Sequence, residues 1–388
     1  MPALLGGTGI IGKDIFVKMK AQKSASIQTA SGTVVTFPQS EERAFSGLSI
    51  YGHSTQSGTP SPENPVPIVS AGDSGEINVT VSGKNLLNIG TVTFEKSKNF
   101  PVNILAGTYT FSAEVKSADT DSNHCLVMFR KNQQNIGTLS VNRVGRSSAT
   151  ITLNENADEI LLYASAGFNE SDGDTATFTD IQLEIGTVAT AYEPYKTPQT
   201  LTLSTPGGLP GIPVDSGGNY TDESGQQWVC DEIDLARGKY VQRVGKTVVD
   251  GVNLKFEVRN EYWNVPDGTT PGIMSGSLPI CNICPQYGRY VGINNAETGF
   301  LFFRGEWAEQ YFADADAINN FAQTTNIVFM YATESPIETD LPAEEIAAYK
   351  ALHTYSPNTT VSNDADAWMK VESTNLINER SENLQKGA

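Results

Sequence analysis

The sequence predicts a mainly β protein with several domains, built from β-sandwich or jelly-roll modules and a few short helices. At 388 residues the chain is too long for one ordinary hydrophobic core. It contains 35 glycines and 19 prolines, whereas charged residues make up only 18% of it. Short runs of alternating apolar and polar residues recur between clusters of Asn, Asp, Ser and Gly, a pattern typical of strands joined by turns.

Residues 1–45 open with a glycine-rich stretch in which Gly7 to Gly12 spells GxGxxG. A dinucleotide-binding turn of this pattern follows a buried strand and precedes an acidic residue by about 20 positions. Neither context is present, because no carboxylate occurs between Asp14 and Glu41. We therefore interpret residues 1–45 as a flexible or strand-adding arm whose glycines let it follow a partner closely.

The next section, residues 46–83, contains four prolines within residues 60–67. Proline has no backbone donor, so this stretch is predicted to be an extended loop and not a helix or central strand. Ile77, Val79 and Val81 then alternate with polar residues, which predicts a strand.

Residues 84–195 are predicted to form a compact β-sandwich. Strict alternation begins at Tyr109, and further strand-like runs follow at 125–130, 149–153, 160–164 and 175–186. In the last run the apolar positions change parity between Phe178 and Ile181. One extra residue would cause this change, so we expect a β-bulge near Asp180.

Two sections complete the chain, a β domain over residues 251–341 and a helical segment over residues 342–388. Strand-like patterns cover residues 252–258, 300–303 and 326–332. A short helix is expected over residues 314–323, and a clearer one is predicted to begin at Pro342. Residues 366–386 are expected to be helical, with an apolar stripe made of Trp368, Val371, Ile377 and Leu384.

The formal net charge is −18, and the acidic excess lies after residue 45. An acidic body repels a phosphate backbone, so nucleic-acid binding is not expected. No apolar run reaches the roughly 18 residues of a membrane span, and the N-terminus lacks the pattern of a signal peptide. Insertion into a membrane is therefore not expected.

The 4 cysteines are too few for a disulfide framework. Cys125 lies in a strand-like run and is expected in a core. Cys281 and Cys284 form a CxxC pair with Cys230 upstream, but a zinc site needs four ligands. Structural thiols are the first interpretation, and a zinc site or a redox pair are the alternatives.

Several longer phrases carry a resemblance to a known class of protein. Residues 46–83, 217–244 and 333–372 resemble tail and baseplate proteins of long-tailed bacteriophages and prophages of Gram-positive hosts. The phrases KNLL at 84–87, AGTYTFSAEVK at 106–116 and DIQLEIGTVATAYEPY at 180–195 resemble a carbohydrate-binding-module-like jelly roll.

The resemblance implies a discontinuous β domain made of residues 46–83 and 196–250, with residues 84–195 inserted as the jelly roll. It also implies a structural virion protein of a tail tip, baseplate or tail fibre, assembled in the host cytoplasm and located in the virion tail. Its expected partners are other tail proteins, contacted through the N-terminal arm, and a host-surface glycan. Homo-oligomerisation, as a trimer, is expected because several weak sugar sites gain avidity together.

Sugar recognition needs aromatic faces for the C–H side of a pyranose and amides or Arg for its hydroxyls. Such residues cluster in the predicted sandwich, and the candidate carbohydrate-binding set is Phe129, Arg130, Asn132, Asn135, Tyr163 and Phe168. The alternative is that the aromatic residues belong to the core and the amides to an exposed hairpin.

Calcium is the cofactor that the sequence favours, if the protein has one. Residues 169–174 group oxygen ligands around a glycine, and Asp180 falls at the expected bulge. The resemblance implies a structural calcium site that uses an acid of the last strand, so Asp174 and Asp180 are the candidate ligands. A solvated turn is the alternative.

No catalytic constellation is apparent, because His53, His124 and His353 are far apart and none has a recognisable Ser or Cys nucleophile nearby. We therefore expect an adhesive structural protein and not an enzyme. A glycan-degrading tail enzyme and a purely architectural capsid or tail decoration protein remain the alternative hypotheses.

Overall fold

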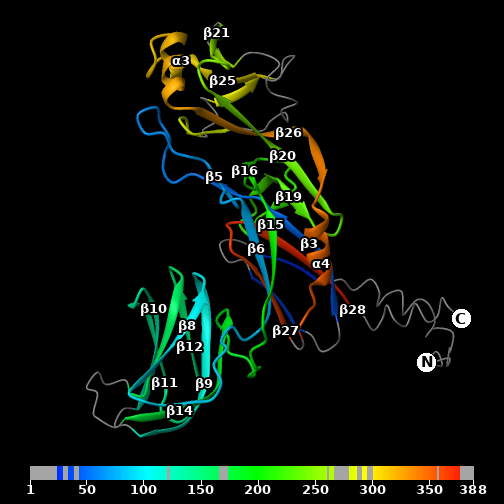
Figure 1. Ribbon diagram of the computed structural model, residues 1–388. Helices are drawn as coiled ribbons and strands as arrows, with labels where there is room; N and C mark the ends of the chain where they lie inside the picture. Colours follow the sequence, from blue (N-terminus) through cyan, green and yellow to red (C-terminus); the bar gives the residue numbers. More distant parts are fainter. Residues whose placement is uncertain are drawn as a thin grey trace, which may run out of the picture.

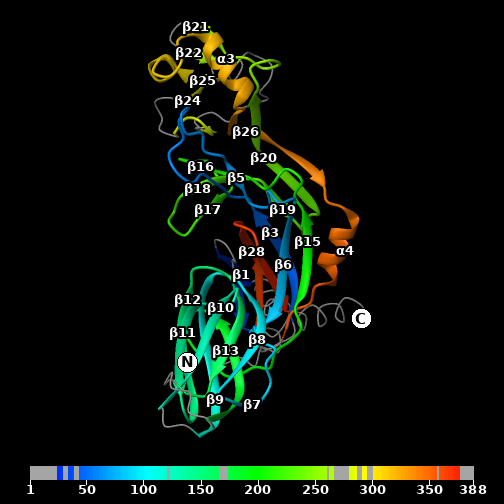
Figure 2. The same cartoon turned by 60° about the vertical axis from the view of Figure 1, so that its left-hand side comes forward.

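The computed structural model describes residues 24–28, 34–38, 43–119, 123–165, 174–259, 262–265, 279–285, 291–294, 300–355 and 358–375. The GxGxxG motif lies outside this part of the chain. The structure is mainly β, as predicted, and consists of three bodies stacked along one long axis (Figure 1). A sandwich lies at one end, a central body follows it, and a smaller body with helix α3 lies at the other end (Figure 2).

The sandwich consists of two four-stranded antiparallel sheets with the strand orders β11-β10-β13-β8 and β12-β9-β14-β7. Its strands are β7 (Val92–Glu95), β8 (Ser97–Ile104), β9 (Gly107–Asp119), β10 (His124–Lys131), β11 (Gln134–Asn142), β12 (Gly145–Leu153), β13 (Ala157–Tyr163) and β14 (Thr175–Ile185). The strands expected from alternation are confirmed. Strands β7, β8 and β11 were not predicted, and they complete the two sheets.

The expected bulge in the last strand of the sandwich is confirmed. The pairing of β14 with β9 shifts register between Thr179 and Gln182, and Asp180 has a left-handed backbone with φ +51. Because of the extra residue, Phe178 and Ile181 both point into the core although three positions separate them.

The central body is made of two stacked antiparallel sheets. The larger has the order β1 (Ser24–Gln28), β28 (Trp368–Asn375), β3 (Arg43–Tyr51), β19 (Glu232–Asp234), β20 (Lys239–Val249), β26 (Ile327–Asp340) and β23 (Ile280–Cys281). The smaller has the order β15 (Gln199–Ser204), β6 (Glu76–Gly83), β27 (Asn358–Asn363) and β2 (Val34–Pro38). Side chains of both sheets, including Ile50, Val79 and Met369, form one core between them.

Smaller elements complete the central body. A three-stranded sheet contains β16 (Gly211–Val214), β18 (Gln227–Cys230) and β17 (Tyr220–Thr221), and a short ladder joins β4 (Ser54–Thr55) to β5 (Val69–Ser70). A hairpin turn precedes β18, because Gly225 N–H donates to Asp222 O at 3.0 Å. Helix α4 (Ala343–Ala351) packs beside β15 and begins directly after Pro342, close to where it was predicted.

The third body contains the sheet β21 (Glu257–Arg259), β22 (Tyr262–Asn264), β25 (Phe300–Arg304) and β24 (Val291–Asn294), with helices α2 (Gly305–Ala308) and α3 (Ala315–Thr324). Helix α3 was predicted, and Asp314 caps it by accepting the N–H of Ala317 at 2.9 Å. Aromatic side chains dominate the core here, and the ends of β20 and β26 reach into it from the central body.

Two local predictions were wrong. Alternation from Val252 predicted a strand, but Asp250 Oδ1 accepts the N–H groups of Val252, Asn253 and Leu254 and holds this stretch as a loop. Strand β21 begins only at Glu257.

The helical prediction for residues 366–386 was also wrong where the structure describes it, because Trp368–Asn375 forms β28 in the middle of a sheet. Trp368 and Val371 are 4% and 1% exposed, so this part of the predicted apolar stripe belongs to the core. Ile377 and Leu384 lie outside the described residues.

The predicted N-terminal arm contributes two strands to the chain's own sheets. Strand β1 pairs with β28, and β2 pairs with β27, so both extend sheet edges formed by the C-terminal strands. The strands that this arm adds over residues 24–28 and 34–38 therefore belong to sheets of the same chain.

The two connections between the sandwich and the central body lie side by side. Strand β6 leads into the sandwich and β15 leaves it, and these strands pair with Val81 opposite Gln199. Next to this pairing, Lys84 Nζ lies 2.9 Å from Glu193 Oε1, and both side chains are almost fully buried. The sandwich thus enters and leaves the body through one closely packed junction.

Candidate functional site

One face of the sandwich that points away from its core is apolar in the middle. In sheet β11-β10-β13-β8, Leu126 lies opposite Tyr163 and Met128 lies opposite Leu161. These side chains form a separate small cluster, because the adjacent Val127 and other residues of opposite parity fill the core instead. We call this the outer face of the sandwich.

Polar groups border the apolar strip of the outer face. Arg130 Nη1 donates to Glu159 Oε1 at 2.7 Å, and Asn99 Nδ2 donates to Glu159 Oε2 at 2.8 Å. On the other side, the exposed residues Thr138 and Ser140 stand opposite Met128 and Leu126 across the β10–β11 pairing. Tyr163 is the partly exposed member of this cluster, and an aromatic ring with hydrogen-bonding groups nearby suits a sugar that has one C–H face and hydroxyls at its edge.

The structure divides the predicted carbohydrate-binding set. Arg130 and Tyr163 lie on the outer face, within one pair of neighbouring strands. Phe129 is 0% exposed and packs in the sandwich core, so no sugar can reach its ring. The prediction failed here because alternation places Phe129 and Arg130 on opposite faces.

The predicted amides lie in and after the β10–β11 turn, at the end of the outer face. Asn132 is exposed, with φ +48, and its N–H donates to Asp158 Oδ2 at 2.8 Å. Asn135 Nδ2 donates to Thr138 Oγ1 at 2.9 Å. Phe168 lies outside the described residues.

The central residues of the outer face, Leu126, Met128 and Leu161, were missed from the sequence. One signal was present, because residues 125–129 are apolar at every position, which indicates a strand shielded on both faces. The acidic partner Glu159 carried no signal of its own.

The two predicted calcium ligands do not come together. Asp174 directly precedes β14, and Asp180 lies six residues further along this extended strand, so roughly 20 Å separates them. Calcium–oxygen distances are about 2.3–2.6 Å, so the two carboxylates cannot share one ion. Across the described ranges, no group of three or more His, Cys, Asp or Glu side chains could hold a metal.

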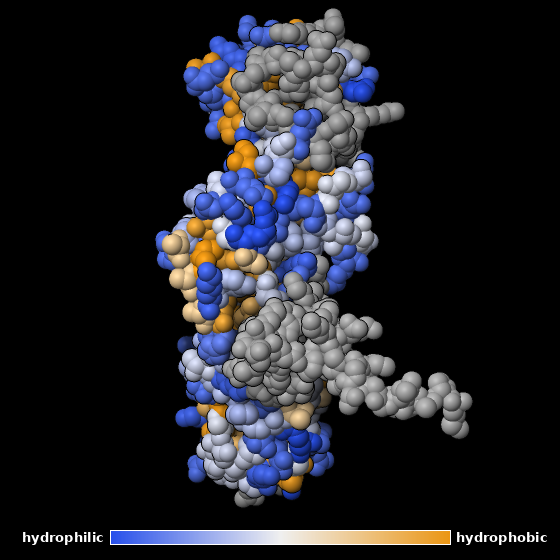
Figure 3. Space-filling view, turned by 90° about the vertical axis from the view of Figure 1, so that its right-hand side faces the viewer, coloured by the Kyte–Doolittle hydropathy of each residue, from blue (hydrophilic) through white to orange (hydrophobic). Residues whose placement is uncertain are grey.

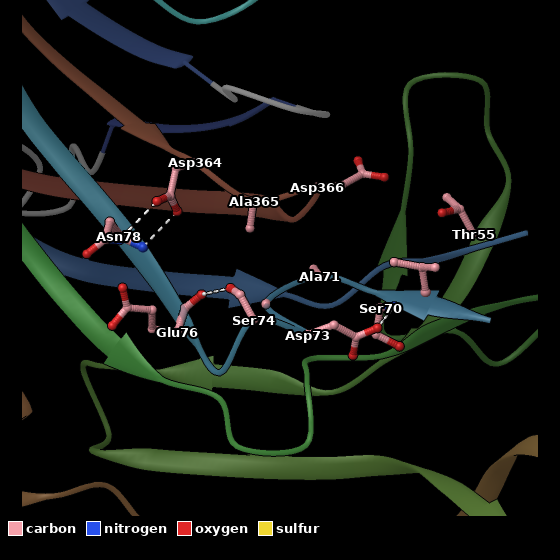
Figure 4. A pocket seen from close by; sticks show the side chains of 12 residues that line it. Thr55, Ser70, Ala71, Asp73, Ser74, Glu76, Asn78, Asp364, Ala365 and Asp366 are labelled. Carbon is pink, nitrogen blue, oxygen red and sulfur yellow. Dashed lines mark hydrogen bonds between the residues drawn. The ribbon is translucent and has the colours of Figure 1, made fainter. Parts of the chain in front are cut away.

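A second polar region lies on the central body, in a hollow of about 350 Å³ (Figure 4). Three of the four carboxylates that line it, those of Asp73, Asp364 and Asp366, are already bound to the protein itself. Asp364 accepts the N–H and Nδ2 of Asn78 at 2.8 and 2.9 Å, and Asp73 accepts Ser70 N–H at 2.8 Å. These hydrogen bonds therefore link neighbouring segments of the central body.

A histidine in the central body has an acidic partner but no hydroxyl nucleophile bonded to it. His53 Nδ1 lies 3.0 Å from Asp366 Oδ2, and the ring packs against Trp228 and Trp368. The adjacent Ser54 hydroxyl instead pairs with Ser70 Oγ at 2.9 Å. This arrangement fixes an aromatic cluster and does not form a Ser-His-Asp relay.

The cysteines are free thiols buried in the protein. Burial raises the pKa of Cys125 to about 11 and that of Cys281 to about 12. These groups therefore stay protonated at neutral pH, and the thiolate that binds zinc or exchanges disulfides is disfavoured.

A groove of about 910 Å³ separates the sandwich from the smaller sheet of the central body. Hydroxyls and amides line one wall, and apolar and aromatic side chains line the other.

The surface elsewhere is mostly hydrophilic on the face seen in Figure 3, with hydrophobic residues in limited patches. None of the described helices is long and apolar enough to cross a membrane.

Comparisons with known proteins identify no family for this chain. No protein-family model and no curated protein matches it. One solved structure that resembles it is the tripod (BppUct-A-L) from the baseplate of bacteriophage Tuc2009, at 14% identity over 58% of this chain and 91% of that chain. The TM-score is 0.20, which does not establish a common fold, so we base no conclusion on it.

Proposed function

We propose that this chain is a structural protein of a phage tail tip, baseplate or tail fibre, and that its sandwich binds a host-surface glycan. The first part is supported by the long phrases that resemble phage tail proteins, together with the mainly β, multi-body architecture. In this proposal, residues 46–83 and 196–250 form one domain and residues 84–195 are an inserted module. The pairing of Val81 with Gln199 supports that division.

The observation that carries the adhesive role is the outer face of the sandwich. Leu126, Met128 and Leu161 are only 7–9% exposed, so the apolar surface proposed to contact the sugar is the partly exposed ring of Tyr163 beside them. Arg130 and Glu159 form an ion pair at its edge, and Arg130 also donates to Gln133 O, so a sugar hydroxyl would share these groups with their protein partners. Sugar rings are bound by this combination of a flat apolar contact and charged hydrogen-bonding groups.

A glycan array probed with the full chain tests the adhesive role. We expect Tyr163→Ala and Arg130→Ala each to lower the apparent affinity about tenfold, a loss of roughly 1.4 kcal/mol. The controls are Tyr192→Ala, which removes the same phenol ring, and Lys131→Ala, which removes a cationic side chain, in each case outside the outer face. Equal binding by all four variants would refute the outer face as the site, and release of reducing sugar would favour a glycan-degrading enzyme instead.

The attachment of the protein to the particle is proposed to use the N-terminal residues. Because β1 and β2 belong to the chain's own sheets, the part proposed to dock is residues 1–23. Deleting residues 1–23 should leave a folded protein that is absent from virions viewed by electron microscopy with a specific antibody. Normal incorporation of the truncated protein would contradict the docking role.

We also propose a trimer, because linked weak sugar sites can raise avidity by roughly 10²–10⁴. Light scattering of the purified full chain at micromolar concentration measures the mass directly. A monomer under these conditions would exclude a trimer that forms without the virion.

A further inference from the structure

We propose that the groove between the sandwich and the central body is a second glycan site, which takes an extended stretch of uncharged polysaccharide. This site is separate from the outer face, since the two share no residue. With a volume of about 910 Å³, it falls within the usual range for binding sites of small organic ligands.

One wall of the groove is a regular array of hydroxyl groups on the smaller body sheet. Thr80 of β6 stands opposite Thr200 of β15 on one side and Ser362 of β27 on the other, and these three side chains are exposed or partly exposed. Ser82 stands opposite Thr360 deeper in the wall, where they are 5% and 4% exposed. Neighbouring strands are about 4.8 Å apart, so these side chains form a grid whose spacing is close to the length of a sugar ring. Each hydroxyl can both donate and accept, as sugar hydroxyls do.

The opposite wall comes from the sandwich and its exit segment and is mostly apolar, although Asn85, Asn88 and Asn103 also line it. It is lined by side chains that present C–H groups and ring faces, among them Phe100, Pro101, Val102, Tyr109, Tyr195 and Pro198. Tyr195 is only partly buried, which leaves part of its ring available. A polymer in the groove would meet hydroxyls on one side and apolar surface on the other, which matches the two faces of a pyranose.

The charge of the groove favours a neutral ligand. Lys and Arg are absent from the described residues that line it, and its one carboxylate belongs to Asp364. That carboxylate already accepts two hydrogen bonds from Asn78 (Figure 4). Anionic polymers would find no cation in this lining, and the net charge of −18 repels them as well.

The groove is held open by the junction between the two bodies. Lys84 Nζ lies 2.9 Å from Glu193 Oε1 and also donates to Thr190 Oγ1 and Ala191 O. Asn358 Nδ2, from the start of β27, donates to the same Glu193 oxygen at 2.5 Å. These contacts fix the sandwich relative to the hydroxyl wall, so the groove is formed before any ligand binds.

The experiment measures binding of the full chain to an array of neutral and anionic oligosaccharides about three to six sugars long. Thr200→Trp fills the groove from an exposed position, and the pair Thr80→Val with Ser362→Ala removes two hydroxyls without filling it. We expect each change to weaken binding to neutral oligosaccharides about tenfold, roughly 1.4 kcal/mol. The control Thr152→Trp places the same ring at an exposed strand position outside the groove.

The results separate the groove from the outer face. Loss of binding with the groove variants but not with Tyr163→Ala supports the groove alone, and the reverse pattern overturns it. Binding unchanged in Thr200→Trp, equal binding of anionic oligosaccharides, or no binding by the unmodified chain would each overturn the groove proposal. Thermal unfolding of each variant excludes misfolding as the cause of a loss.

Discussion

The sandwich and the central body are both stacks of antiparallel sheets, but they differ in where their core residues lie in the sequence. Every member of the sandwich core lies between Leu86 and Ile185. The core of the central body combines residues from Phe45 to Val371, contributed by segments on both sides of the sandwich. The sandwich can therefore form from local contacts, whereas the body needs contacts between distant parts of the chain.

The largest expected effect comes from removing the last described strand. Truncation after Asp366 deletes β28, which lies between β1 and β3 in the larger sheet. We expect the central body to lose its cooperative unfolding transition entirely, because its core loses Met369 and Val371 and its sheet is split. Calorimetry should still detect the sandwich transition, and loss of both transitions would show that the sandwich depends on the body.

The counterpart of that truncation is the sandwich alone, residues 84–195. About 110 residues suffice for a stable core, so the fragment should fold, and near-ultraviolet circular dichroism would report it. Replacing residues 85–194 by a short Gly-Ser bridge should leave the body folded, because Val81 and Gln199 are paired neighbours. An unfolded fragment would refute the independence of the sandwich.

A cavity in the core of one body should lower the unfolding free energy of that body alone. Phe129 is completely buried in the sandwich, and Phe129→Ala should lower its unfolding free energy by about 3–5 kcal/mol. Phe303→Ala is the matched change in the third body, where Phe303 is equally buried. Amide hydrogen exchange, measured by mass spectrometry at increasing denaturant concentration, shows which body has lost stability in each variant. Equal losses of stability in both bodies would contradict their independence.

The central body should also respond to pH in a way that the sandwich does not. Burial raises the pKa of Asp231 to about 6, although the carboxylate accepts hydrogen bonds from Tyr240, Arg243 and Val244. The folded state thus holds this proton more tightly than the unfolded state. The body should lose up to about 3 kcal/mol of stability as pH rises from 4 to 6 and little beyond that.

Asp231→Asn tests this dependence, because the amide oxygen can still accept the N–H groups of Arg243 and Val244. We expect the variant body to unfold with a flatter pH profile between pH 4 and 6, whereas the sandwich profile stays unchanged. An identical slope in the variant would mean that another group causes the dependence.

The smallest effect is expected at the junction. Asn358→Ala removes the hydrogen bond that joins β27 to Glu193, at a cost of about 1–3 kcal/mol for the buried partner left behind. Both bodies should keep their own cores, but the coupling between their unfolding transitions should weaken. A variant whose transitions remain coupled as before would show that other junction contacts, such as Lys84 with Glu193, are sufficient.

The contrast between the two regions also explains what the sequence could predict. Alternation predicted five of the eight sandwich strands and the bulge near Asp180, because these depend on local pattern. Strand β28 was taken for a helix although Met369, Val371 and Ser373 alternate as buried positions. Polar residues on both sides made that short pattern hard to recognise. The partner strand β3 lies over 300 residues earlier, so no local pattern can indicate that the two strands pair.

The candidate sites follow the same rule. Arg130 and Tyr163 could be predicted, since their chemistry is visible in the sequence, but the shielded apolar strip between them could not. Whether Leu126 or Phe129 faces outward depends on where the second sheet packs. The groove was beyond prediction, because its walls come from segments that meet only once the sandwich sits on the body.

The paired connections at Val81 and Gln199 have a consequence for how this protein could change. A domain whose ends lie as close together could replace the sandwich without altering the backbone pairing of the sheet beneath it. Under the proposed function, exchange by recombination at this one position would alter the surface proposed to meet the host, while the parts proposed to build the particle stay the same. In such a protein, a change of host could be inherited as one unit.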